Sequence, residues 1–189
     1  RPMKILFVSS ECAPFSKSGG LADVAFSLPP ALQKTGDDMA IVTPMYRVTQ
    51  ENYGDEFERI KTCQIVLGQR RLACSLYRGA LNGVTVYAIG NEHLFHRPRL
   101  YGYGDDSLRF AFFCRAVIDL LPEFGDLPDI LHCNDWETAL AILYLKNDAV
   151  LRPELSHIKT VYTIHNIAYQ GKFGRSEMEA TFALPDGWY

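Results

Sequence analysis

The chain has 189 residues, a length that suits one α/β domain and leaves little room for two. Hydrophobic residues make up 48% and charged residues 22%, which permits a packed core and disfavours disorder. The formal net charge of -3 argues against a nucleic-acid binder that relies on a basic face, and it gives no reason to expect an anionic membrane surface as partner.

The five cysteines are odd in number, and no two of them have C-x-x-C spacing. A disulfide framework and a zinc site are therefore disfavoured, and we expect reduced, mostly buried thiols in the cytoplasm. No apolar run approaches the ~20 residues of a membrane span. The apolar stretch at residues 5–8 is too short for the apolar region of a signal peptide.

The N-terminal part has the order of a βαβ unit. Residues 3–9 and 40–43 are short apolar runs, typical of strands buried on both faces of a parallel sheet. Between them, a loop over residues 11–20 precedes a predicted helix over residues 21–34. Pro29 and Pro30 predict a kink or a split in this helix, and Gly36 is the expected stop.

The middle of the chain predicts antiparallel strands over residues 57–67, 71–78 and 83–89. Asn82-Gly83 is a strong signal for a two-residue hairpin turn. We expect this β excursion to lie at the edge of the sheet.

The later part returns to alternating helices and strands. Residues 107–121 predict a helix with one apolar face, and residues 129–133 and 160–164 predict strands. Asn134 is the expected N-cap of a following helix, with Glu137 as the other half of a capping box. The buried stripe expected on that helix consists of Trp136, Ala139, Leu140 and Leu143. The predicted fold class is α/β: a Rossmann-like, mostly parallel sheet with flanking helices and an antiparallel β-hairpin excursion.

Three polar loops follow predicted strands, over residues 10–20, 132–135 and 165–171. In a parallel sheet, ligands bind beyond the carboxyl ends of the strands, so these loops are the candidate site. The first contains Lys17-Ser18-Gly19-Gly20 just before a helix, which suits phosphate binding. The alternative is a plain glycine turn with a solvated lysine.

The other two loops carry polar side chains that suit a sugar. Asp135 can accept hydrogen bonds from hydroxyl groups, or it can simply complement the helix dipole. His132 could act as a base or as a ligand, but a histidine in such a position is more often a packing residue. His165 and Asn166 can offer donors to a bound sugar or to developing charge, or they can bond to their own loop backbone.

The segment YGYGDD at residues 101–106 predicts a flexible loop that suits sugar stacking or a lid, with plain turn chemistry as the alternative. The adjacent carboxylates of Asp105 and Asp106 are expected to be solvated, with no metal. No serine or cysteine nucleophile stands at a recognisable spacing from a base.

Four blocks together resemble one known family: MKILFVSSECAPFSKSGGLADV, RPRLYGYGDDSLRFAFFCRA, DILHCNDWETAL and YTIHNIAYQGKF. They are similar to the bacterial glycogen synthases and plant starch synthases, which are retaining glycosyltransferases of the GT-B type. The resemblance implies transfer of glucose from ADP-glucose to the non-reducing end of an α-1,4-glucan. It implies front-side attack assisted by the donor's phosphate, without a metal or other cofactor.

The resemblance also assigns the donor loops. It implies that Lys17, Gly19 and Gly20 meet the donor's phosphates and glucose. Asp23 belongs to the same motif and orients it. Tyr101 matches a loop tyrosine that lines the donor site.

On the other side of the site, the resemblance implies catalytic roles for His165, beside the reacting centre, and for Asp135, which contacts the transferred glucose. Asn166 matches a sugar-binding neighbour, and Glu11 stands where the family can contact the acceptor. The family commonly has H-x-H-D-W-H, and here Asn134 and Glu137 replace two of its histidines.

Residues 1–189 are expected to form the N-terminal, acceptor-side catalytic lobe, incomplete at its C-terminal end, with the C-terminal nucleotide-binding lobe of the same chain absent. The fragment alone is therefore expected to be inactive. The alternative is a non-catalytic glucan- or nucleotide-binding α/β module. A nucleotide-dependent oxidoreductase lobe is disfavoured because no G-x-G-x-x-G follows the first strand.

Overall fold

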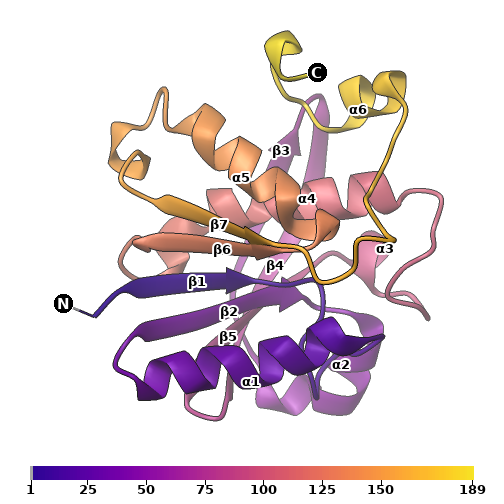
Figure 1. Ribbon diagram of the computed structural model, residues 1–189. Helices are drawn as coiled ribbons and strands as arrows, with labels where there is room; N and C mark the ends of the chain where they lie inside the picture. Colours follow the sequence, from indigo (N-terminus) through magenta and orange to yellow (C-terminus); the bar gives the residue numbers. More distant parts are fainter. Residues whose placement is uncertain (1) are drawn as a thin grey trace.

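The computed structural model describes residues 2–189 and contains a seven-stranded sheet with helices on both faces (Figure 1). The strands are β1 (Lys4–Val8), β2 (Asp38–Pro44), β3 (Glu58–Leu67), β4 (Arg70–Leu81), β5 (Val84–Gly90), β6 (Ile130–Asn134) and β7 (Lys159–Thr163). The helices are α1 (Gly20–Lys34), α2 (Arg47–Tyr53), α3 (Glu92–Phe95), α4 (Asp106–Asp119), α5 (Trp136–Asp148) and α6 (Arg175–Thr181). Short 3-10 helices span Gly54–Glu56, Leu121–Phe124, Pro153–Leu155 and Asp186–Trp188.

The strand order is β3-β4-β5-β2-β1-β6-β7. Strands β5, β2, β1, β6 and β7 are parallel, and β4 runs antiparallel to both β3 and β5. The predicted fold class is confirmed. The predicted hairpin is also present, with Asn82 and Gly83 at φ 49° and 84° in its turn. One detail differs: β5 belongs to the parallel sheet as well as to the excursion, because it pairs with β2.

Two apolar cores lie on the two faces of the sheet, because successive side chains of a strand point to opposite faces. Leu6 and Val8 of β1 belong to the core that contains α4 and α5. Ile5 and Phe7 belong to the other core, with Ala25 of α1. Strand β1 is thus covered on both faces, as its unbroken apolar sequence predicts.

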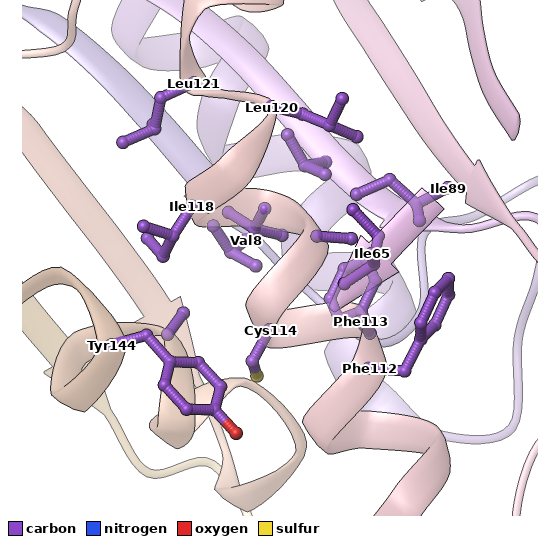
Figure 2. Close-up of a cluster of buried hydrophobic side chains, with 14 of the residues drawn as sticks. Val8, Ile65, Ile89, Phe112, Phe113, Cys114, Ile118, Leu120, Leu121 and Tyr144 are labelled. Carbon is purple, nitrogen blue, oxygen red and sulfur yellow. The ribbon is translucent and has the colours of Figure 1, made fainter. Parts of the chain in front are cut away.

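Helix α4 is buried on nearly all sides, whereas its sequence predicts one apolar face. Figure 2 shows its Phe113 and Ile118 in the cluster with Val8 of β1 and Ile65 of β3. The sheet covers one side of α4, and α5 and α6 pack against the rest. The side chains buried beyond the predicted face include Ser107, Arg109, Ala111, Phe112, Ala116 and Ile118.

Helix α1 is continuous through Pro29 and Pro30, so the alternative of a split helix is wrong. Both proline rings are buried, and this apolar burial offsets the two missing N–H donors. The helix ends as predicted. The Gly36 N–H bonds to the Gln33 carbonyl at 3.1 Å, and Gly36 has φ 110°, which favours glycine.

Two predictions for α5 are wrong. Asn134 is the last residue of β6 rather than the N-cap, which is Asp135, and there is no capping box with Glu137. The predicted stripe is only half-buried. The helix is rotated so that Thr138, Ala141 and Tyr144 lie deepest, because α5 packs against α4 as well as against β6.

Strand β7 lies at one edge of the sheet and exposes apolar side chains. Val161 is 41% exposed and Tyr162 42%, and Ile164, directly after the strand, is 54% exposed. The loop that follows continues this surface with Ile167 and Tyr169. No helix within residues 2–189 is long and apolar enough to cross a membrane.

Candidate functional site

The three polar loops follow the carboxyl ends of neighbouring strands and lie on the same side of the molecule. Strands β1, β6 and β7 are parallel neighbours, so the segments that follow Val8, Asn134 and Thr163 leave the sheet side by side (Figure 1). This is the placement that the sequence predicts for a ligand site in an open α/β sheet.

The Glu11 carboxylate organises the first loop. It is 3% exposed, and its Oε1 accepts hydrogen bonds from the backbone N–H groups of Gly19 (2.9 Å), Ala22 (3.2 Å) and Ser18 (3.4 Å). Gly19 is the N-cap position of α1 and Ala22 lies in its first turn. Glu11 therefore satisfies amides that the start of a helix leaves without partners, and its charge faces the positive end of the helix dipole.

Tyr101 connects the 101–106 loop to Glu11. Its hydroxyl donates to Glu11 Oε2 at 2.7 Å and also lies 2.7 Å from Ser10 Oγ. Burial raises the pKa of Tyr101 well above its ordinary value, so the hydroxyl stays protonated. A buried Tyr46 hydroxyl donates to the Ser10 carbonyl at 2.7 Å. The expected flexible loop is thus held to the first loop at Tyr101.

The rest of the 101–106 loop is also held. The two carboxylates that were expected to be solvated are both paired with arginines: Asp105 Oδ1 lies 2.6 Å from Arg97 Nη1, and Asp106 Oδ1 lies 2.8 Å from Arg109 Nη1. The hydrogen bond from Arg97 lowers the pKa of Asp105. The expectation of solvated carboxylates is wrong because Arg97, which precedes the loop, and Arg109 of α4 each pair with one of them.

Lys17 and Asp23 form an ion pair at the rim of the site. The Lys17 Nζ lies 2.6 and 2.8 Å from the two Asp23 carboxylate oxygens, with the side chains 53% and 60% exposed. A side chain at Gly19 or Gly20 would meet nothing within 4 Å, so packing inside the protein does not require these glycines. Within residues 2–189, the amides of Gly20 and Leu21 have no acceptor, unlike those bound by Glu11.

Asp135 occupies a backbone conformation that is unusual for a side-chain-bearing residue. Its φ of 59° and ψ of 177° lie in a region that is essentially restricted to glycine. Its Oδ1 accepts from the backbone N–H groups of His165 at 2.7 Å and Asn166 at 3.3 Å. Such a conformation costs about 1–3 kcal/mol and is typical of functional sites.

Asn134 orients the His165 imidazole. Asn134 Nδ2 donates to the Val8 carbonyl at 3.0 Å, so its Oδ1 is the acceptor for His165 Nε2 at 2.8 Å. His165 Nε2 therefore carries a hydrogen. Asn134 is fully buried and joins β1, β6 and the loop after β7.

Asn166 and His132 have more local roles. Asn166 Oδ1 accepts from the Ala168 N–H at 3.1 Å, a bond within its own loop. His132 packs edge-on against Phe7 with ring centroids 5.0 Å apart, and its Nε2 lies 2.8 Å from Thr163 Oγ1. Burial lowers the pKa of His132, which makes it a neutral packing residue.

Glu137 is a buried carboxyl behind the site. Burial raises its pKa to about 7, and the nearby charges of Asp135, Glu11 and Asp106 act in the same direction. Its Oε2 is buried and has no hydrogen-bond partner. The acidic surroundings suit the hydroxyl groups of a neutral sugar, whereas phosphate is suited by Lys17 and the start of α1.

A cavity of about 330 Å³ lies next to these residues, between Trp136 and residues 168–173. Gly171 has φ 58°, and a side chain there would lie 2.5 Å from the Trp136 ring. The glycine of the HNIAYQG block thus allows the loop to approach the indole closely. The volume is at the low end for small-molecule pockets.

Sequence reasoning missed the residues that support the site: Ser10, Tyr46, Asn134 and Glu137. The only available signal was the departure of Asn134 and Glu137 from the family's H-x-H-D-W-H pattern. Among residues 2–189, no three His, Cys, Asp or Glu side chains are grouped so that they could hold a metal ion.

The solved structure of the catalytic domain of starch synthase IV from Arabidopsis thaliana, bound to ADP and acarbose, is similar to this chain. The TM-score is 0.86 at 29% sequence identity, and the match covers 100% of this chain and 38% of that one. The fold is accordingly that of the N-terminal lobe of a GT-B glycosyltransferase.

Curated relatives are similar along the whole chain. A glycogen synthase from Geobacillus thermodenitrificans is 43% identical over 189 residues, with 99% of this chain and 38% of that protein covered. A glycogen synthase from Clostridium novyi is 40% identical over 188 residues, with 99% and 39% covered. This chain thus spans about two fifths of their length. The family model described as the starch synthase catalytic domain matches residues 4–189, and the chain belongs to that family.

Proposed function

We propose that this chain is the N-terminal, acceptor-side lobe of a glycogen synthase, which transfers glucose from ADP-glucose to the non-reducing end of an α-1,4-glucan with retention. One observation carries the proposal. Glu11 accepts backbone N–H groups of the Lys17 loop, and Asp135 accepts those of the His165 turn. Both segments are thereby held at the carboxyl ends of the same parallel strands. Lys17 at the start of α1 suits the phosphates of a sugar nucleotide, and the neighbouring Asp135 and His165 suit its sugar hydroxyls.

The donor's phosphates would lie at the Lys17 loop. Lys17 supplies a mobile cation, and the amides of Gly20 and Leu21 supply donors at the positive end of α1. Glycine at positions 19 and 20 leaves space for the ligand to approach the backbone. Asp23 holds Lys17 until the phosphates replace it, and Tyr101, held by Glu11, would line the donor site.

The transferred glucose would lie between Asp135 and His165. The carbon–oxygen bond to the donor's phosphate breaks and a bond to the acceptor oxygen forms on the same face, while the acceptor's proton passes to the departing phosphate. Asp135 and the His165 ring would bind sugar hydroxyls as charge develops, and the bond between Asp135 and the His165 amide, together with the bond between Asn134 and the His165 ring, supports these roles. Asn166 supports this turn and offers its amide to the sugar.

Glu11 was expected to contact the acceptor, and that contact stays a prediction. Both of its carboxylate oxygens are already bound within the protein, so we propose that Glu11 acts mainly by shaping the donor loop. We also place the enzyme in the cytoplasm, since five cysteines without paired spacing suit a reducing compartment.

The test is transfer of radiolabelled glucose from ADP-glucose to glycogen by the full-length protein that contains this chain. We expect transfer by the full-length protein, none by residues 1–189 alone, and a large loss of kcat in Asp135→Asn. Binding of glucan or nucleotide by calorimetry without any transfer by the full-length protein would support the alternative, a non-catalytic binding module. UDP-glucose in parallel reveals the nucleotide preference.

A further inference from the structure

Two cysteines face each other across the β3–β4 hairpin, away from the proposed donor site. Cys63 of β3 and Cys74 of β4 are directly opposite in the antiparallel register. The next pair on the same face is Ile65 and Leu72, which belong to or pack against the core under α4. Both thiols therefore point to the same, inner side of the hairpin.

Their spacing suits a disulfide. Directly opposite residues in an antiparallel pair have Cα atoms about 4.5–5.5 Å apart, and disulfides span about 4.4–6.8 Å. Both cysteines are free, and Cys63 is half-buried while Cys74 is buried. Cys12, Cys114 and Cys133 lie on other elements and are buried.

We propose that Cys63 and Cys74 are a modification site: a dithiol that closes to an intramolecular disulfide when the protein meets a small-molecule disulfide such as oxidised glutathione. The site is separate from the proposed glucosyl transfer and does not depend on it.

The exchange proceeds in two balanced steps. The more exposed Cys63 thiol loses its proton to solvent, and its sulfur attacks the glutathione disulfide. The sulfur–sulfur bond of that disulfide breaks, and the departing glutathione sulfur takes up a proton and leaves as a thiol. The Cys74 sulfur then loses its proton to solvent, attacks the Cys63 sulfur and releases the second glutathione. Two protein thiols are oxidised and one glutathione disulfide is reduced.

The two cysteines have different environments, which gives the steps an order. Burial raises the pKa of the Cys74 thiol, and the neighbouring Cys63 acts in the same direction. Cys74 thus keeps its proton while Cys63, the residue that solvent can reach, reacts first.

The bond would fasten the edge strand β3 to β4. This hairpin supplies Val66, Leu67 and Gly68 to the wall of a cavity of about 370 Å³, which Arg115 and Tyr144 line from the helices. Closing the disulfide restricts the separation of β3 from β4, and it should therefore slow amide exchange in both strands and raise the Tm.

The experiment treats the reduced protein with oxidised glutathione and then counts thiols in denaturant. We expect the count to fall from five to three, with an intact mass lower by two hydrogens and a linked peptide containing positions 63 and 74. Hydrogen exchange should slow in residues 58–81, and the Tm should rise by a few degrees.

Two variants provide matched controls. Cys63→Ser should stay at four thiols. The double variant Thr62→Cys, Cys63→Ser moves the thiol by one position to the exposed, opposite face of β3, where Ser75 is its partner, and it should form no internal disulfide. An unchanged count of five, a persistent glutathione adduct or a bond between other cysteines would overturn the proposal. Equal oxidation of the double variant would do the same.

Discussion

At the residue scale, Lys17 combines a proposed ligand role with a small structural one. Its ion pair with Asp23 is more than half exposed, and such pairs contribute at most about 1 kcal/mol. Lys17→Ala should therefore leave the Tm unchanged. In the full-length protein it should weaken ADP binding by about tenfold to a hundredfold, since a charge-assisted phosphate contact is worth ~1.5–3 kcal/mol.

Calorimetry with ADP checks this prediction. The matched control is Lys34→Ala, which removes an exposed lysine from the other end of α1 and should bind ADP as wild type does. Equal losses in the two variants would show that Lys17 acts only through net charge.

Glu137 makes the stability of the protein depend on pH. Its pKa is raised from 4.5 to about 7, so the folded state binds a proton that the unfolded state releases between these values. The contribution of Glu137 to stability should therefore be fully present below pH 4.5 and be lost as the pH rises to about 7, by up to about 3 kcal/mol. Glu137→Gln removes this contribution, and urea unfolding across that pH range measures it.

The expected result is that Glu137→Gln is more stable than wild type above pH 7 and similar near pH 4.5. The control Glu154→Gln changes an exposed carboxyl whose pKa is lowered by its own backbone and by Arg152, and it should show no such gain at high pH. A gain that is equal at all pH values would point to packing rather than to the proton.

Asn134 determines which nitrogen of His165 carries the hydrogen. Asn134→Leu removes the acceptor of His165 Nε2 and leaves the Val8 carbonyl without its donor. We expect a loss of stability of about 1–3 kcal/mol and a mixture of imidazole tautomers. Nitrogen-15 NMR of the side chain reports the tautomer. In Asn134→Asp the acceptor remains, so the Nε2–H form should persist; a mixture there would contradict the assignment.

At the scale of elements, Glu11 serves as the cap that α1 lacks locally, since Gly19 has no side chain to accept a hydrogen bond. Glu11→Ala removes one acceptor shared by three amides and the partner of Tyr101. We expect a loss of about 2–4 kcal/mol in unfolding free energy and faster amide exchange over residues 17–22.

Glu11→Gln is the informative comparison. Its amide oxygen can still accept from Gly19, and its NH₂ group can donate to the Tyr101 hydroxyl, whose hydrogen can turn towards Ser10 Oγ. Less than half of the alanine effect is expected. A glutamine variant as unstable as alanine would mean that the charge at the helix start, rather than the geometry, stabilises the loop.

The sequence was informative about elements wherever local signals were unopposed. Strand β1 is a short apolar run, and the turn at Asn82 and Gly83 needs positive φ, so both were predictable. The capping box failed because the Asn134 side chain bonds to Val8 and His165 instead, a tertiary contact that no local pattern contains. The prediction of the buried stripe of α5 was wrong for a related reason. Helix α4 and strand β6 bury α5 from different sides, and the sequence of α5 alone does not show this.

At the scale of the whole molecule, the common edge of the three loops was predictable, because parallel strands end on the same side. What was not predictable is how the loops support one another. Glu11 and Tyr101 are 90 positions apart, and Glu137 acquires its raised pKa mainly because the fold buries it, with the charges of Asp135, Glu11 and Asp106 adding to that effect. The placement of candidate groups thus follows from topology, whereas their protonation and orientation follow from long-range packing.

The two edges of the sheet differ in their protection against self-association. Strand β3 begins with three charged residues, Glu58, Arg59 and Lys61, whereas β7 exposes Val161 and Tyr162. We expect the 189-residue chain to associate with rising concentration through β7. Val161→Lys should reduce this association in light scattering, while Val66→Lys, on the opposite edge strand, should not. Equal effects would indicate that added charge alone keeps the chain dispersed.

The backbone of Asp135 affects how this sequence can change by mutation. Replacement by glycine would relieve a conformation that costs about 1–3 kcal/mol, and would remove the acceptor of the His165 and Asn166 amides, a loss of similar size. Folding alone is therefore nearly indifferent between aspartate and glycine at this position. If the proposed transfer were no longer required, replacement of Asp135 by glycine would be a route by which the protein could lose the activity while keeping the fold.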